Sequence, residues 1–204
     1  MKRLLSPIFF FSALINNAVY TEVLQGVLEK YKKSNTFICM GVYSSTNLAR
    51  ALDAGFSELY AIDEDQILLD HARIIFPRDT NPHNYNALKN CTFKPGDFKT
   101  LKEVLYSIHV PATILLGSYF PDADTCQNNY IMHQLDIIQF HHVKTHVILI
   151  DYVNYAGTTR FDNISLDTLI AKLLEINPNY KLYFETGGIL GKEQHAILVA
   201  YTIH

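Results

Sequence analysis

The stretch that decides the fold is TFICMGVYSSTNLARALDAGFSELYAID, residues 36–63. It opens on Thr36-Phe-Ile-Cys-Met40, a short apolar run before a glycine, which is typical of a buried strand followed by a turn. Apolar residues at helical spacing follow over 48–52, and Gly55 stands where a helix C-cap glycine is expected. A second apolar run, Leu59-Tyr-Ala-Ile62, completes a strand–helix–strand unit. Such a unit is the building block of a parallel sheet.

The alternation of strands and helices continues on both sides of this unit. Apolar periodicity predicts helices near 23–31, 67–75, 128–140 and 166–174, and strands near 91–93, 112–116 and 146–150. The helix over 67–75 is expected to stop before Pro77, because the residue before a proline disfavours helical backbone. The polar stretch 77–90 is expected to be a loop that covers a site.

The last two predicted strands, 180–184 and 195–201, are joined by a glycine-rich connection that is too short for a crossover helix. They are therefore expected to pair antiparallel. The whole pattern predicts an α/β fold with a doubly wound, mainly parallel, seven-stranded Rossmann-like sheet that ends in an antiparallel hairpin. In such sheets ligands bind outside the carboxyl ends of the strands, so functional residues are expected just after the strands.

Length and composition exclude several classes of protein. The 204 residues suit one full domain, and 49% apolar with 18% charged residues excludes a mainly disordered chain. The 17 basic and 20 acidic residues give a net charge of −3 without a run of like charges, so a dedicated nucleic-acid binder is not expected. Cys39, Cys91 and Cys126 are odd in number and lack CxxC spacing, which predicts buried thiols rather than disulfides or a zinc site.

The N-terminus has two open interpretations. Lys2 and Arg3 precede an uncharged run of 12 residues, 4–15, which is shorter than the roughly 20 residues of a membrane span but fits a signal peptide ending near Ala18. The alternative is a core helix at the start of the domain. The first interpretation predicts a signal segment at 1–18, a domain at 19–204, and an exported or envelope-associated protein; the second is compatible with the cytoplasm.

Candidate ligand-binding residues follow three of the predicted strands. Gly41 lets the backbone approach a ligand, although a lone glycine after a strand is also an ordinary turn residue. Asp63 ends the second strand 22 residues later, close to the offset of an acid that binds ribose hydroxyls in dinucleotide-type folds. Asp97 and Phe98 follow the third strand, where a carboxylate and a ring suit an adenine; the alternative for Asp97 is a helix N-cap.

The segment 37–63 resembles the first two motifs of class I S-adenosylmethionine-dependent methyltransferases, and the terminal hairpin is similar to the last strands of that fold. The segment 146–153 resembles a small branch of the same superfamily. The resemblance implies that Gly41, Tyr43 and Ser44 line the methionine part of S-adenosylmethionine, that Asp63 binds the ribose, and that Asp97 and Phe98 bind the adenine.

The sequence also departs from the pattern of this family. Cys39 stands where such enzymes usually carry an acid, and Ser45 stands where a second loop glycine is usual. Leu116 lies near the end of the fourth predicted strand, where an acid is usual. At the end of the strand over 146–150, Asp151 is predicted as a general base, with a loop-fixing hydrogen bond as the alternative. Asp122 and Asp124 are candidates for positioning a substrate, or simply solvated loop residues.

Metal binding is not expected. His141, His142 and His146 lie between a predicted helix and a predicted strand, so no two are assured of sharing one helix face, and no carboxylate is nearby in sequence.

The sequence thus predicts a methyltransferase-like protein that uses S-adenosylmethionine and a small-molecule or peptide acceptor. The alternative is a catalytically inactive binding module of the same fold, suggested by the departures at Cys39, Ser45 and Leu116. A Rossmann-type oxidoreductase is less consistent with the chain, because the glycine fingerprint is absent. The oligomeric state is not predicted.

Overall fold

Seven strands form one mixed sheet in the order β3-β2-β1-β4-β5-β7-β6. The computed structural model describes residues 23–42, 45–79, 87–117, 130–187 and 193–203. The strands are β1 (Thr36–Met40), β2 (Glu58–Asp63), β3 (Cys91–Pro95), β4 (Thr113–Leu116), β5 (Val147–Ile150), β6 (Lys181–Gly187) and β7 (Glu193–Tyr201). The first five are parallel, whereas β7 runs antiparallel to both β5 and β6. The predicted sheet and its closing hairpin are confirmed.

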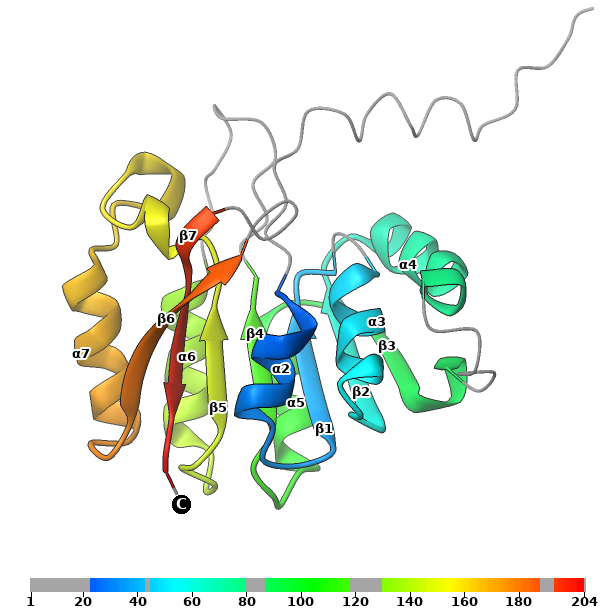
Figure 1. The fold of residues 1–204 in the computed structure, drawn as a ribbon, viewed down its shortest axis with the longest axis horizontal. Helices are drawn as coiled ribbons and strands as arrows, with labels where there is room; N and C mark the ends of the chain where they lie inside the picture. The colour runs from blue at the N-terminus through cyan, green and yellow to red at the C-terminus, as the bar shows by residue number, and fades with distance from the viewer. Residues whose placement is uncertain (1–22, 43–44, 80–86, 118–129, 188–192, 204) are drawn as a thin grey trace, which may run out of the picture.

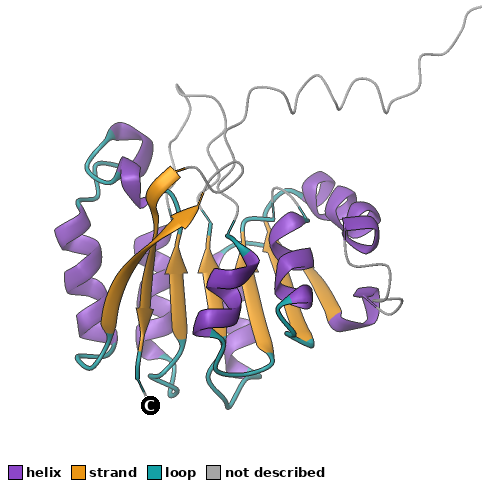
Figure 2. Cartoon of the chain, in the orientation of Figure 1, coloured by secondary structure: helices purple, strands orange, loops and turns teal. Residues whose placement is uncertain are grey.

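Six α-helices of the described chain cover the two faces of the sheet (Figures 1 and 2). They are α2 (Gln25–Tyr31), α3 (Thr46–Asp53), α4 (Gln66–Asp79), α5 (Phe98–Tyr106), α6 (Ile131–Phe140) and α7 (Leu166–Ile176). Apolar residues of α2, α3 and α4 join one core cluster, and those of α5, α6 and α7 join the cluster on the opposite face. The sheet is therefore the middle of three layers.

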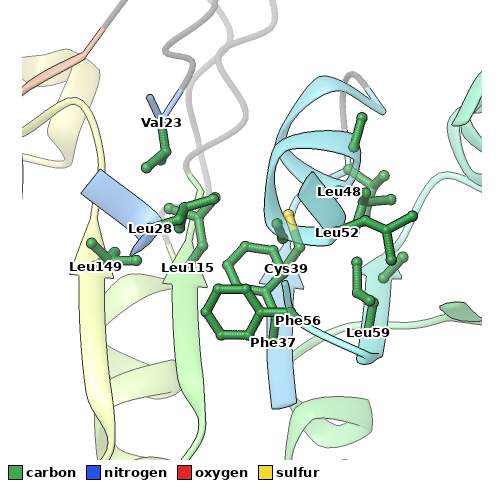
Figure 3. Packing of buried hydrophobic residues seen from close by; sticks show 14 of the residues in the cluster. Val23, Leu28, Phe37, Cys39, Leu48, Leu52, Phe56, Leu59, Leu115 and Leu149 are labelled. Carbon is green, nitrogen blue, oxygen red and sulfur yellow. The ribbon is translucent and has the colours of Figure 1, made fainter. Parts of the chain in front are cut away.

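The side chains of the central strands alternate between these two clusters. Cys39, Leu115 and Leu149 belong to the cluster under α2 and α3, where Figure 3 shows them in a row across β1, β4 and β5. Their sequence neighbours Leu116 and Ile150 belong to the other cluster. Every residue of β1, β4 and β5 is buried, which explains why these strands are continuous apolar runs in the sequence.

One helix boundary differs from the expectation. Helix α4 does not stop before Pro77 but continues to Asp79. Proline inside a helix removes one hydrogen bond and crowds the carbonyl four residues earlier, so the turn must be held by tertiary contacts. Such a contact exists one residue earlier, where the buried ring of Phe76 packs edge-on against Phe93 with centroids 6.2 Å apart. The expected loop is correspondingly shorter, and a 3₁₀ turn (Ala87–Asn90) precedes β3.

Two short 3₁₀ turns after β5, Val153–Tyr155 and Thr159–Phe161, have no counterpart in the sequence prediction. The apolar segment 4–15 and the predicted signal segment 1–18 lie outside the described residues. Within the described chain, no helix is both long and apolar enough to cross a membrane.

Candidate functional site

Four residues from neighbouring strands form one row at the carboxyl end of the sheet. The register pairs Met40 with Ile62 and with Leu116, and Leu116 with Ile150. The next residue of each strand therefore stands at a common level, in the order Asp63, Gly41, Gly117, Asp151, and we call this set the terminal row.

Backbone hydrogen bonds hold the terminal row together. The N–H of Gly41 donates to Ile62 O at 2.9 Å, that of Gly117 to Met40 O at 2.9 Å, and that of Asp151 to Leu116 O at 3.3 Å. These bonds continue the strand ladders one residue beyond the strands. Two carboxylates thus stand at the ends of the row, with two glycines between them.

The glycines keep the middle of the row free of side chains. Gly41 has a φ of +81°, in the left-handed region that favours glycine, and a Cβ there would lie 3.2 Å from Gly117 O. A Cβ on Gly117 would lie only 2.6 Å from Met40 O. Side chains are therefore disfavoured at both positions, and only backbone stands in the middle of the row.

The carboxylate of Asp63 is held by the backbone on two sides. Its Oδ2 accepts the Val42 N–H at 2.7 Å, and its Oδ1 accepts the Asp65 N–H at 2.9 Å. Burial raises the pKa of Asp63, and the backbone N–H groups of Asp65, Val42 and Glu64 partly oppose that shift. Because each carboxylate oxygen has two acceptor sites, the Asp63 carboxylate retains capacity for a ligand hydroxyl.

Asp151 lies at the other end of the row and is only 3% exposed. Side chains alternate along a strand, so Asp151 shares a face with Leu149, which belongs to the same core cluster as Cys39. Burial raises the pKa of the Cys39 thiol, and the charges of Asp151 and Asp63 raise it further. The thiol is therefore protonated, and both carboxylates act on the end of β1.

Asp97 and Phe98 follow β3 as predicted. Asp97 caps α5, since its Oδ1 accepts the Lys99 N–H at 2.7 Å, which confirms the N-cap interpretation. Phe98 packs against α6, with its ring stacked on His133 and tilted against Tyr130, both at 5.4 Å between centroids. The Gly96 N–H donates to Asp63 O at 2.8 Å and so connects this corner to the terminal row.

Four predicted site residues, Tyr43, Ser44, Asp122 and Asp124, lie outside the described residues. The structure brings together Gly41, Asp63 and Asp151 in the terminal row, with Asp97 and Phe98 beside it. Sequence reasoning missed Gly117 as a member of the site. The sequence feature that could have identified Gly117 is a glycine directly after a buried strand, the same feature that identified Gly41.

The histidines occupy the opposite end of the sheet, before β4 and β5. The Ala112 N–H donates to Nδ1 of His146 at 3.0 Å, and Nε2 of His146 lies 2.8 Å from Nδ1 of His141. No group of three or more His, Cys, Asp or Glu side chains able to hold a metal occurs among the described residues. His141 and His146 are part of the buried structure at the far end of the sheet.

Comparison with known proteins identifies the class of fold. No family model matches the chain, and no curated protein matches it in sequence. Among solved structures, a protein from Streptococcus mutans classed as a methyltransferase, in complex with SAH, is 14% identical with a TM-score of 0.54, over 98% of this chain and 99% of that one.

Two further solved structures show the same arrangement. A protein from Clostridium thermocellum classed as an rRNA methylase is 12% identical with a TM-score of 0.57, over 88% of this chain and 95% of that one. Spermidine synthase from Thermotoga maritima is 9% identical with a TM-score of 0.55, over 85% of this chain and 56% of that one. Together with the strand order, these likenesses show that the chain has the class I methyltransferase fold.

Proposed function

We propose that this protein is an S-adenosylmethionine-dependent methyltransferase whose cofactor lies across the terminal row. The observation that carries the proposal is the row itself, an anchored carboxylate beside two glycines at the carboxyl ends of adjacent parallel strands. Open α/β sheets bind ligands at this edge. The class I methyltransferase fold supports the same choice of ligand.

The described residues fit the parts of such a cofactor. Asp63, held by the Val42 and Asp65 N–H groups, has acceptor capacity for ribose hydroxyls. Gly41 and Gly117 leave only backbone in the middle of the row, which suits the narrow chain linking ribose to amino acid. Phe98 lies beside the row, where its ring is the proposed contact of the adenine ring.

When bound, S-adenosylmethionine supplies an activated methyl group on its sulfonium. The protein then has mainly to bind and orient, since alignment of donor and acceptor accounts for most of the rate gain in such a transfer. The two glycines and the anchored Asp63 fix the cofactor. The absence of an acid at Cys39 does not prevent this, because Asp63 and Asp151 still place two carboxylates at this edge.

For the acceptor we propose a small molecule or a peptide. The net charge of −3, without a run of like charges, does not favour the phosphate backbone of a nucleic acid. The acidic terminal row itself also disfavours a polyanion.

Replacing Asp63 with alanine is expected to weaken SAH binding roughly ten- to a hundred-fold, because the ligand loses a charged acceptor and the Val42 N–H loses its partner. Titration calorimetry measures the affinity. Asp70→Ala, on the exposed side of α4, is the matched control and leaves the affinity unchanged. An Asp63→Ala protein that binds SAH as the unmodified chain does would contradict the ribose assignment.

A thermal-shift panel separates the proposed class from its alternatives. We expect SAH and S-adenosylmethionine to raise the melting temperature and NAD to leave it unchanged. Stabilisation by SAH without methyl transfer to any of a broad set of amine, hydroxyl, thiol and peptide acceptors would favour an inactive binding module of this fold. Stabilisation by NAD alone would point to an oxidoreductase.

A further inference from the structure

The terminal row has an acid at each end, and the proposed function uses only one of them. Asp63 and Asp151 are separated by the two glycines, that is, by three strand spacings. At about 4.8 Å per spacing their Cα atoms are roughly 14 Å apart. Both side chains belong to the face of the sheet that α2 and α3 cover, since they continue the alternation of Ala61 and Leu149.

Asp151 is the residue of the row that brings negative charge to β5. On β1, two residues before Gly41 and on the same face of the sheet, Cys39 is a buried neutral thiol. Gly117 on β4 has no side chain that stands between the two strands. The carboxylate of Asp151 acts electrostatically on the Cys39 thiol, more strongly than Asp63 does.

The conformation of the next residue fixes where Asp151 stands. Tyr152 has a φ of 57°, in the left-handed region that a residue with a side chain rarely adopts, and it is buried. The chain therefore turns directly after Asp151, and the acid remains at the level of the row rather than in the loop beyond it. A carboxylate at 3% exposure is also shielded from water, which strengthens its interaction with a cation.

We infer that Asp151 binds the ammonium group of the amino-acid end of the cofactor. This inference rests on the proposed function. With Asp63 on the ribose, an extended S-adenosyl amino acid crosses Gly41 and Gly117 and brings its ammonium to β5. The ribose-to-ammonium stretch plus a hydrogen bond of about 2.8 Å at each end has a length comparable to the row. Asp151 thus supplies the negative charge at the β5 end of the row, where Gly41 and Gly117 contribute no side chain.

This role differs from the general base predicted from the sequence. A general base must contact the acceptor, whereas the inferred role requires contact with the amino group of the cofactor. The two roles differ in what they recognise: a binding role depends on the amino group of the cofactor, and a base does not.

The test is a cycle of two variants and three ligands, measured by titration calorimetry. The ligands are SAH, an SAH analogue with hydrogen in place of the amino group, and 5′-methylthioadenosine, which has the ribose and adenine but no amino acid. We expect Asp151→Asn to weaken SAH roughly twenty- to a hundred-fold and the other two ligands less than threefold. Asp63→Asn is the matched control and weakens all three alike, because each contains the ribose.

The outcomes separate this inference from the proposed function. Equal effects of Asp151→Asn on SAH and on the deaminated analogue, or no effect on either, would overturn the ammonium assignment while leaving SAH binding intact. If the unmodified chain bound none of the three ligands, the proposed function would be overturned instead. Should Asp151→Asn not fold, Asp151→Glu and the affinity ratio of SAH to its deaminated analogue on the unmodified chain answer the same question. A ratio near one contradicts the assignment.

Discussion

Gly117→Ala is expected to lower the free energy of unfolding by about 2–4 kcal/mol and to abolish tight SAH binding. The new Cβ would lie 2.6 Å from Met40 O, so β4 must move away from β1. That movement lengthens the bond from the Gly117 N–H to Met40 O, and the cost combines overpacking with a weakened buried hydrogen bond. Gly41 shifts as well, because its carbonyl lies 3.5 Å from the same point.

Urea unfolding and calorimetry measure the two effects. Gly26→Ala is the matched control, since a Cβ on Gly26 in α2 has no heavy atom within 4 Å. Alanine in a helix is expected to stabilise the protein there by roughly 0.5–1 kcal/mol. A Gly117→Ala protein as stable as the unmodified chain would show that β1 and β4 are not packed as described.

Acidification is expected to destabilise the fold through His146. The Ala112 N–H occupies Nδ1 of His146, so the neutral ring carries its proton on Nε2 and donates it to Nδ1 of His141. Nε2 of His141 is buried and has no hydrogen-bond partner among the described residues. Neither ring has a free lone pair for a further proton.

Burial, with His141, His142 and Lys144 as further causes, lowers the pKa of His146 to about 3. Burial, followed by the charge of His142, also lowers the pKa of His141. The unfolded chain binds protons below about pH 6.5, whereas the folded chain does not until its lowered pKa values are reached. Stability is therefore full above pH 6.5 and falls as the pH falls below it, by about 1.4 kcal/mol per pH unit for His146 alone.

Urea unfolding at pH values from about 8 to about 5 tests this slope. His146→Asn retains an acceptor for the Ala112 N–H but removes the titrating group, and we expect its stability to depend less on pH than that of the unmodified chain. His71→Asn, on α4 and far from the pair, keeps the original slope. Equal slopes for all three proteins would show that the pair titrates normally.

Much of this fold follows from local sequence pattern. β1, β4 and β5 are buried on both faces, so they stand out as apolar runs, and a polar or glycine residue after each run marks the carboxyl edge. Gly41, Asp63 and Asp151 were predicted in this way, and parallel register then brings them to one level. The N-cap role of Asp97 was one of two predicted roles for the same reason, since a cap is a local feature.

Other features depend on contacts between distant segments. Local rules end the helix before Pro77, yet α4, with Phe76 packed on Phe93, continues to Asp79. The need for glycine at position 117 arises only because Met40 O on the neighbouring strand lies so close. The pairing of His141 with His146 likewise needs the end of α6 to meet the start of β5, which periodicity does not show.

The central claim is that the terminal row binds an S-adenosyl ligand, and titration calorimetry of the unmodified full chain with SAH tests it most directly. The account predicts saturable one-to-one binding with a Kd of roughly 1–100 µM, or about −5.5 to −8 kcal/mol. A chain that is folded by circular dichroism and still gives no heat of binding at millimolar SAH would contradict it.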